Sequence, residues 1–128
     1  MKTEYIDVDG KWGIVIVMDF DTEYEYDELV AIMESFGMRH RNIEKSMRIL
    51  STYNSGMAIS RDDIRMSCVF IAPTTSNTQF WNTVAHEMNH VATAIVDYYG
   101  EPYDGEGMAH LHGYLLQKVV EEIATPCV

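Results

Sequence analysis

The pattern of hydrophobic and polar positions predicts two strands and then two helices in the first part of the chain. Tyr5 to Val8 and Lys11 to Asp19 have the residue pattern of strands, and Asp9-Gly10 between them is a strong hairpin signal. Apolar residues at helical spacing predict a helix that Asp27 caps and that runs through Phe36. A second helix is predicted from about Asn42 to Leu50.

The second part of the chain repeats this order. Met57 to Ser60 and Ile64 to Ala72 are predicted as strands. A long helix follows, with Ser76 as its N-cap and Gly100 as its stop, and a last helix is predicted from about Glu106 to Ile123. This order predicts an α+β fold for residues 1–128 as a single domain, with a small mixed β-sheet packed against helices.

Composition supports a globular chain and excludes several partners. The 128 residues are 47% hydrophobic, which is enough for one core. No segment approaches a membrane span, and the acidic residues that follow Met1 do not fit a secretory signal, so the expected location is cytoplasmic, without a membrane partner. The net charge of -11 repels phosphates and argues against a nucleic acid partner. Cys68 and Cys127 lack zinc-site spacing and are interpreted as free thiols.

The charged residues are unevenly distributed along the chain. An acidic cluster comprises Asp19, Asp21, Glu23, Glu25, Asp27 and Glu28. Four of the nine basic residues follow it, namely Arg39, Arg41, Lys45 and Arg48. Both clusters are interpreted as solvated faces, and a contact between them is the alternative.

One segment of the long helix indicates a chemistry: His86-Glu87-Met88-Asn89-His90, an HExxH motif. Residues four apart lie on one face of a helix, so His86 and His90 can direct two imidazole nitrogens at one metal ion. Glu87 is offset from them, so its carboxylate can reach a water on the metal and act as general base. The motif therefore predicts a zinc hydrolase, and the alternative is the solvated side of an amphipathic helix.

A catalytic zinc usually has three protein ligands, so one ligand remains to be found. The metzincin pattern does not continue here, because Thr93 and Val96 stand where it requires glycine and histidine. The chain instead resembles the gluzincins, HExxH metallopeptidases whose third ligand is a downstream glutamate, often in an E-x-x-A setting. Glu106-Gly107-Met108-Ala109 matches that setting. The stretch from Glu106 to Leu115 is also similar to the second helix of short HExxH proteins of phages and related mobile elements.

This resemblance covers roughly residues 64 to 120 and rests on two short motifs. It implies a zincin-like fold, in which the HExxH helix and the following C-terminal helix pack on the sheet. It also implies a Zn²⁺ cofactor held by His86, His90 and Glu106, with Glu87 as general base. His110 stands where many gluzincins carry an acid. It is the alternative third ligand or a catalytic donor to the oxyanion, and the other candidate donors are His112, Tyr103 and Tyr114. His112 also competes for the place of third ligand, and a site without a third protein ligand is the remaining alternative.

These roles predict a zinc-dependent peptidase that acts on a peptide or protein substrate. The alternative is a zincin-like structural or interaction module, with or without zinc. If Ile64 to Ala72 forms the sheet edge beside the cleft, its free backbone groups could pair with an extended peptide; the alternative is an internal strand. The sequence indicates neither a preferred substrate nor an oligomeric state.

Overall fold

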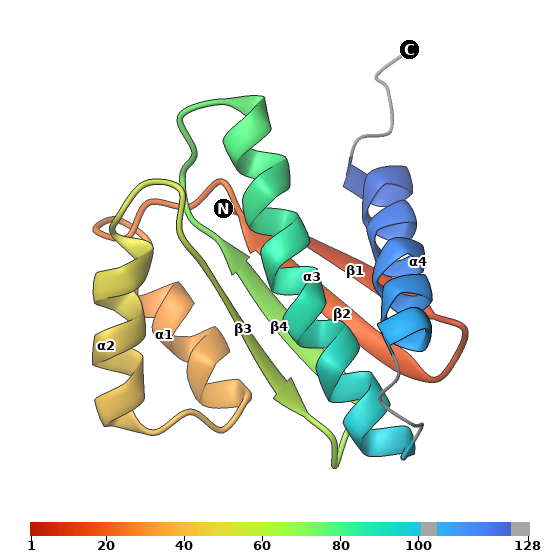
Figure 1. Ribbon diagram of the computed structural model, residues 1–128. Coiled ribbons are helices and arrows are strands. Elements are labelled where there is room, and N and C mark those ends of the chain that lie inside the picture. The colour runs from red at the N-terminus through yellow and green to blue at the C-terminus, as the bar shows by residue number, and fades with distance from the viewer. Residues whose placement is uncertain (101–104, 124–128) are drawn as a thin grey trace.

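A computed structural model describes residues 1–100 and 105–123, with side chains from residue 107 onward in the second segment. It contains a four-stranded mixed sheet and four helices, so the predicted α+β class is confirmed (Figure 1). In chain order the elements are β1 (Lys2–Val8), β2 (Trp12–Met18), α1 (Tyr26–Ser35), α2 (His40–Leu50), β3 (Gly56–Arg61), β4 (Met66–Ile71), α3 (Asn77–Tyr99) and α4 (Gly105–Ile123).

The strands are arranged in the order β1-β2-β4-β3. The pairs β1–β2 and β3–β4 are antiparallel, whereas β2 and β4 are parallel. Asp9 and Gly10 both have positive φ angles, of 55° and 69°, as the tight turn of a twisted hairpin requires, so this predicted hairpin is confirmed.

Of the two positions left open for Ile64 to Ala72, sheet edge or internal strand, the structure has the internal one. β4 lies between β2 and β3, and β3 is the edge strand on that side of the sheet. The physical reason is visible in the burial of β4, since Cys68, Val69 and Phe70 are all fully buried. A continuous apolar run of this kind is typical of a strand that is covered on both faces.

Helices cover both faces of the sheet (Figure 1). Alternate side chains of the central strands point to opposite faces, as the two-residue period of a strand dictates. Val69 and Ile71 pack in one apolar cluster with residues of α3 and α4, whereas Cys68 and Phe70 pack in another with residues of α1 and α2. None of the helices in the described part of the chain has both the length and the hydropathy to cross a bilayer.

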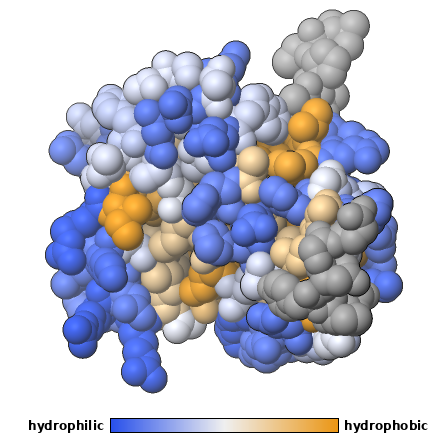
Figure 2. All heavy atoms as spheres, in the orientation of Figure 1, coloured by the Kyte–Doolittle hydropathy of each residue, from blue (hydrophilic) through white to orange (hydrophobic). Residues whose placement is uncertain are grey.

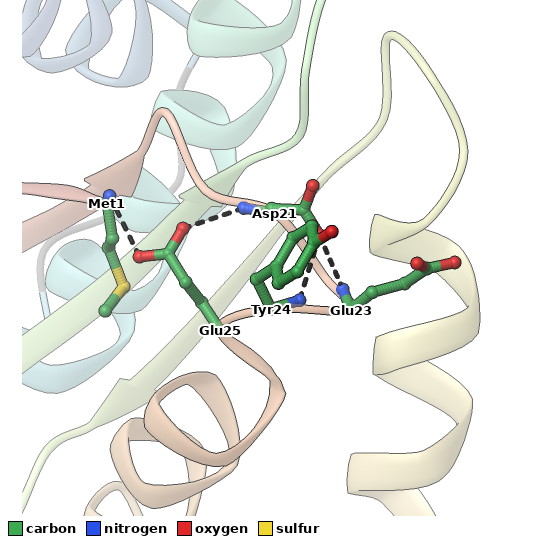
Figure 3. A network of polar contacts seen from close by, with 5 residues as sticks. All are labelled: Met1, Asp21, Glu23, Tyr24 and Glu25. Atoms are coloured by element: carbon green, nitrogen blue, oxygen red, sulfur yellow. Dashed lines mark hydrogen bonds and ion pairs between the residues drawn. The ribbon is translucent and has the colours of Figure 1, made fainter.

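The start of α1 differs from the prediction that Asp27 caps it, because Asp27 lies inside the helix. The entry to the helix is held by a network that joins Met1, Asp21, Glu23, Tyr24 and Glu25 (Figure 3). Asp21 Oδ1 accepts hydrogen bonds from two backbone N–H groups, at 2.8 and 3.0 Å. The N-terminal amine of Met1 and the backbone N–H of Asp21 lower the pKa of Glu25. The carboxylates of Asp21 and Glu25 thus hold the entry to α1, and Asp27 does not cap it.

The two predicted ends of α3 are confirmed. Ser76 Oγ accepts a hydrogen bond from the backbone N–H of Gln79 at 3.1 Å, so Ser76 is the N-cap. Gly100 has a left-handed backbone with φ of 69°, which ends the helix. Val84, Met88, Val91 and Ala92 are fully buried on the inner side of α3. The helix that carries the HExxH motif is therefore anchored at both ends and along one side.

Candidate metal centre

The HExxH motif lies within α3 and lines a hollow of about 490 Å³ between this helix and the edge strand β3, which we call the α3 hollow. Because 3.6 residues make one turn, His86, His90 and Asp97 recur on one side of the helix. This polar side of α3 faces the hollow. Its lining includes Ala58 and Ser60 from β3, and His86, Glu87, His90 and Asp97 from α3.

His86, Glu87 and His90 are close enough to hold one metal ion. Their potential ligand atoms all lie within 4.8 Å of one another, and the two imidazole rings have centroids 5.1 Å apart. Both histidines are exposed, with 70% of the His86 side chain accessible. Over residues 1–100 and 107–123, this is the only such group of three or more histidine, cysteine or acidic side chains. The prediction that the motif brings its side chains together is confirmed.

Glu87 differs from the two histidines because it is only 3% exposed. Its Oε1 lies 3.9 Å from His86 Nε2, and its Oε2 has no hydrogen-bond partner within the part of the chain that the structure describes. Burial raises the pKa of Glu87, and the nearby His86 and His90 lower it by less. A buried carboxylate oxygen without a partner is costly, so a bound cation or water fits this position. Imidazole nitrogens and a carboxylate oxygen together suit a divalent transition metal.

The wall of the α3 hollow includes a close contact that the sequence analysis missed. A Cβ atom on Gly56 would lie 2.7 Å from Thr83 Cγ2 and 3.1 Å from Glu87 Cγ. β3 can therefore approach α3 this closely only because residue 56 is glycine. Thr83 Oγ1 donates to the carbonyl of Gln79 at 3.0 Å, so its buried hydroxyl is satisfied. The available signals were a glycine at a strand start and a threonine inside an apolar helical stripe.

Two candidate donors on α4 make contacts elsewhere. His112 Nε2 lies 2.9 Å from the carbonyl oxygen of Ala85, and because a carbonyl only accepts, Nε2 carries the proton. The Tyr114 hydroxyl donates to Asp9 Oδ1 at 2.8 Å, in the turn between β1 and β2. β1 is the sheet edge opposite β3, so both contacts hold α4 on the flank of α3 that faces away from the α3 hollow.

The remaining candidates on and before α4 stay predictions. His110 is exposed on α4 and is not a member of the close group around Glu87. The backbone of Glu106 lies in the first turn of α4, but its side chain is outside the described part of the chain. Tyr103 also lies outside the described residues. The roles of Glu106 as third ligand and of His110 as catalytic donor therefore remain proposals.

No protein-family model matches the chain, and neither a curated protein nor a solved structure was found to match it. The resemblance to gluzincins therefore rests on the HExxH motif and on the short motif that begins at Glu106. What the molecule itself establishes is a mixed-sheet α+β fold with a histidine–glutamate–histidine group close enough for one metal ion.

Proposed function

We propose that this protein is a zinc-dependent peptidase in which His86 and His90 bind the metal and Glu87 is the general base. The observation that carries the proposal is the buried Glu87 carboxylate beside two exposed histidines, with one oxygen that has no partner among the described residues. Imidazole is a preferred zinc ligand, and a catalytic site must leave one coordination position open. The chemistry that the metal supplies when bound is Lewis acidity, which lowers the pKa of a water molecule toward neutrality.

The surroundings of Glu87 support its role in proton transfer. Burial raises its pKa, which makes its carboxylate a stronger base than an exposed one. The neighbouring His86 and His90 limit this increase in pKa. In the proposed reaction Oε2, the unpartnered oxygen, accepts the proton of the attacking water and then returns it to the leaving amine.

The position of β3 supports a peptide as the substrate. An edge strand presents unpaired N–H and C=O groups, with which an extended peptide can pair. β3 provides this free edge, which Ile64 to Ala72, as an internal strand, does not. Because Ala58 and Ser60 line the α3 hollow, a peptide that pairs with β3 would run beside Glu87.

The proposal assigns two further roles by resemblance to gluzincins. Glu106 is the third zinc ligand, from the first turn of α4. His110 lies one helical turn later and donates a hydrogen bond to the oxyanion that forms when water attacks the peptide carbonyl.

A structural zinc module is the alternative function. It is less well supported, because His86 and His90 are exposed and the described residues already form two buried apolar clusters. In a structural site the energy of metal binding is part of the energy of folding, and removal of the metal unfolds the domain. We therefore expect chelation to abolish hydrolysis while changing the melting temperature only modestly.

The test replaces Glu87 by glutamine, which keeps the shape of the side chain but cannot accept the proton of water. We expect Glu87→Gln to lower peptide hydrolysis by about 10²- to 10⁴-fold and to leave the zinc content unchanged. The matched control is Glu44→Gln, because Glu44 is an exposed glutamate 3.1 Å from His40 on α2. It should cleave like the wild type.

Hydrolysis is measured by digestion of a broad peptide library, and zinc by elemental analysis of protein purified without a histidine tag. Equal turnover by Glu87→Gln and the wild type would show that Glu87 is not the general base. Complete unfolding on chelation, together with no cleavage of any peptide, would favour the structural module.

A further inference from the structure

The edge strand β3 separates two hollows. The first is the α3 hollow, and the second, of about 440 Å³, lies between β3 and α2, and we call it the α2 groove. Met57 and Ala58 line both. Ala58 packs with the α3 side of the sheet, whereas Met57 and Ile59 pack with the α1 and α2 side. Since side chains of a strand alternate between faces, a peptide paired with β3 would direct neighbouring side chains into different hollows.

The α2 groove has an apolar floor and a basic rim. Ile49, Met57 and Ile59 contribute its apolar surface. Arg39 and Lys45 contribute two positive charges, and no acidic residue belongs to the lining. Neither basic side chain forms an ion pair within the described residues. In Figure 2 apolar atoms gather along β3, between the hydrophilic surfaces over α2 and α3.

This basic rim contrasts with the charge of the whole protein. At a net charge of -11, the protein repels an acidic peptide at long range. An acidic side chain is therefore favoured only where positive charge is locally concentrated and unpaired. The rim of the α2 groove is such a place, directly beside the strand edge that is free to pair with a peptide.

We propose that the α2 groove is a subsite for an aspartate or glutamate side chain of an extended peptide bound along β3. Arg39 and Lys45 pair with its carboxylate, and Met57 and Ile59 contact its methylene groups. In the bound peptide, this acidic residue is next in sequence to the residue whose side chain faces the α3 hollow. The inference rests on the proposed function, since it names the substrate class of the same site: extended peptides with an acidic residue next to the residue beside Glu87.

The experiment measures binding rather than cleavage, with the full-length Glu87→Gln protein. The probes are two fluorescent peptides long enough to pair with all of β3, one alternating threonine and glutamate and the other alternating threonine and glutamine. Alternation places every glutamate on one face of the bound strand. Fluorescence anisotropy should show that the glutamate peptide binds about 3- to 30-fold more tightly, as expected for two partly exposed ion pairs.

Two double variants assign the preference to the α2 groove. Arg39→Gln with Lys45→Gln should abolish the preference for glutamate. Arg41→Gln with Arg48→Gln is the matched control, because it makes the same change in net charge on the same helix and neither residue lines the groove. It should retain the preference.

The inference is overturned if the two peptides bind equally, if neither binds, or if both double variants lose the preference alike. Its failure is distinguishable from that of the proposed function, because the assay requires no hydrolysis. If the protein cleaves peptides but binds the two probes equally, the subsite is ruled out and the proposed function stands. If the protein binds the glutamate peptide more tightly but cleaves no peptide, the proposed peptidase function is ruled out and the subsite stands.

Discussion

Histidines on the two sides of α3 lie in opposite situations. Toward β3, His86 and His90 are exposed beside Glu87, whose Oε2 has no partner among the described residues. Toward α4, His112 donates to the carbonyl of Ala85 across the interface between the two helices. The first flank is available for a ligand, and the second is closed by packing. The surroundings of a histidine, rather than its residue type, therefore separate candidate chemistry from a structural role.

The largest expected effect comes from removing one histidine on each flank. We expect His90→Ala to lower zinc affinity by more than about 100-fold. Removing a residue that only hydrogen-bonds to a metal ligand costs about 10- to 100-fold in affinity, and removing the ligand itself should cost more. His112→Ala should leave zinc affinity unchanged and lower the free energy of unfolding by about 1 kcal/mol, the usual contribution of one hydrogen bond. Zinc titration calorimetry and urea unfolding measure the two quantities.

Glu106→Gln in the same calorimetric titration tests the third ligand. A loss of affinity comparable to that of His90→Ala would support Glu106 as a ligand. If His110→Gln weakens zinc binding and Glu106→Gln does not, the two assignments must be exchanged. If His112→Ala removes the metal, the contrast between the two flanks is wrong.

Two glycine to alanine changes, one in β3 and one in α4, give the next largest effect. In Gly56→Ala the new Cβ would meet Thr83 Cγ2 at 2.7 Å, so we expect a loss of about 1–3 kcal/mol in stability from overpacking. Gly113→Ala on α4 is the matched control, because nothing lies within 4 Å of its new Cβ. It should stabilise the helix by about 0.5–1 kcal/mol. Urea unfolding of both variants checks the signs, and a neutral Gly56→Ala would contradict the close contact.

The smallest effect concerns Cys68, which lies across the sheet from both flanks of α3 and whose pKa burial raises to about 12. An unfolded thiol ionises near pH 8.5, so the folded state holds its proton where the unfolded state releases it. Stability is therefore complete below about pH 8.5 and falls as pH rises toward the folded pKa. Between pH 7.5 and pH 9 the expected loss is about 0.8 kcal/mol.

Urea unfolding at the two pH values, in a Cys127→Ser background, measures this loss, and Cys68→Ala should lack it. Alkylation of Cys68 then compares the two histidines, because His112 bonds across the α3–α4 interface whereas His90 is exposed. His112→Ala should speed the alkylation more than His90→Ala. The reverse order would mean that the exposed histidine contributes more to the stability of the core.

Local signals in the sequence predicted much of this fold. Asp9-Gly10, Ser76 and Gly100 act on their own neighbours, so their turn, cap and stop could be identified without the structure. The strand at the edge could not be identified, because sheet order depends on pairing between distant segments. Asp27 was wrong as a cap because the competing network reaches back to residues 1 and 21.

In the candidate site, too, residues close together in the sequence could be predicted and contacts between distant residues could not. His86, Glu87 and His90 lie within one helical turn, so their spacing alone places them together. The contact of Gly56 with Thr83 and Glu87 joins residues far apart in the sequence, so the local signals at Gly56 and at Thr83 do not show that the two residues meet. Glu106 was reached by resemblance alone, and its role stays a prediction.

The parallel pairing of β2 with β4 has a consequence for the order of folding. Residues 19–65 must be enclosed before these two strands can meet, and the entropic cost of closing a loop grows with its length. The two hairpins and the α1–α2 pair are local, so they are expected to form first. Residues of α3 pack in one apolar cluster with residues of β1, β2 and β4, so we expect the α3 hollow to be completed only after the sheet has formed. Ligands of this site should then slow unfolding while leaving the folding rate unchanged.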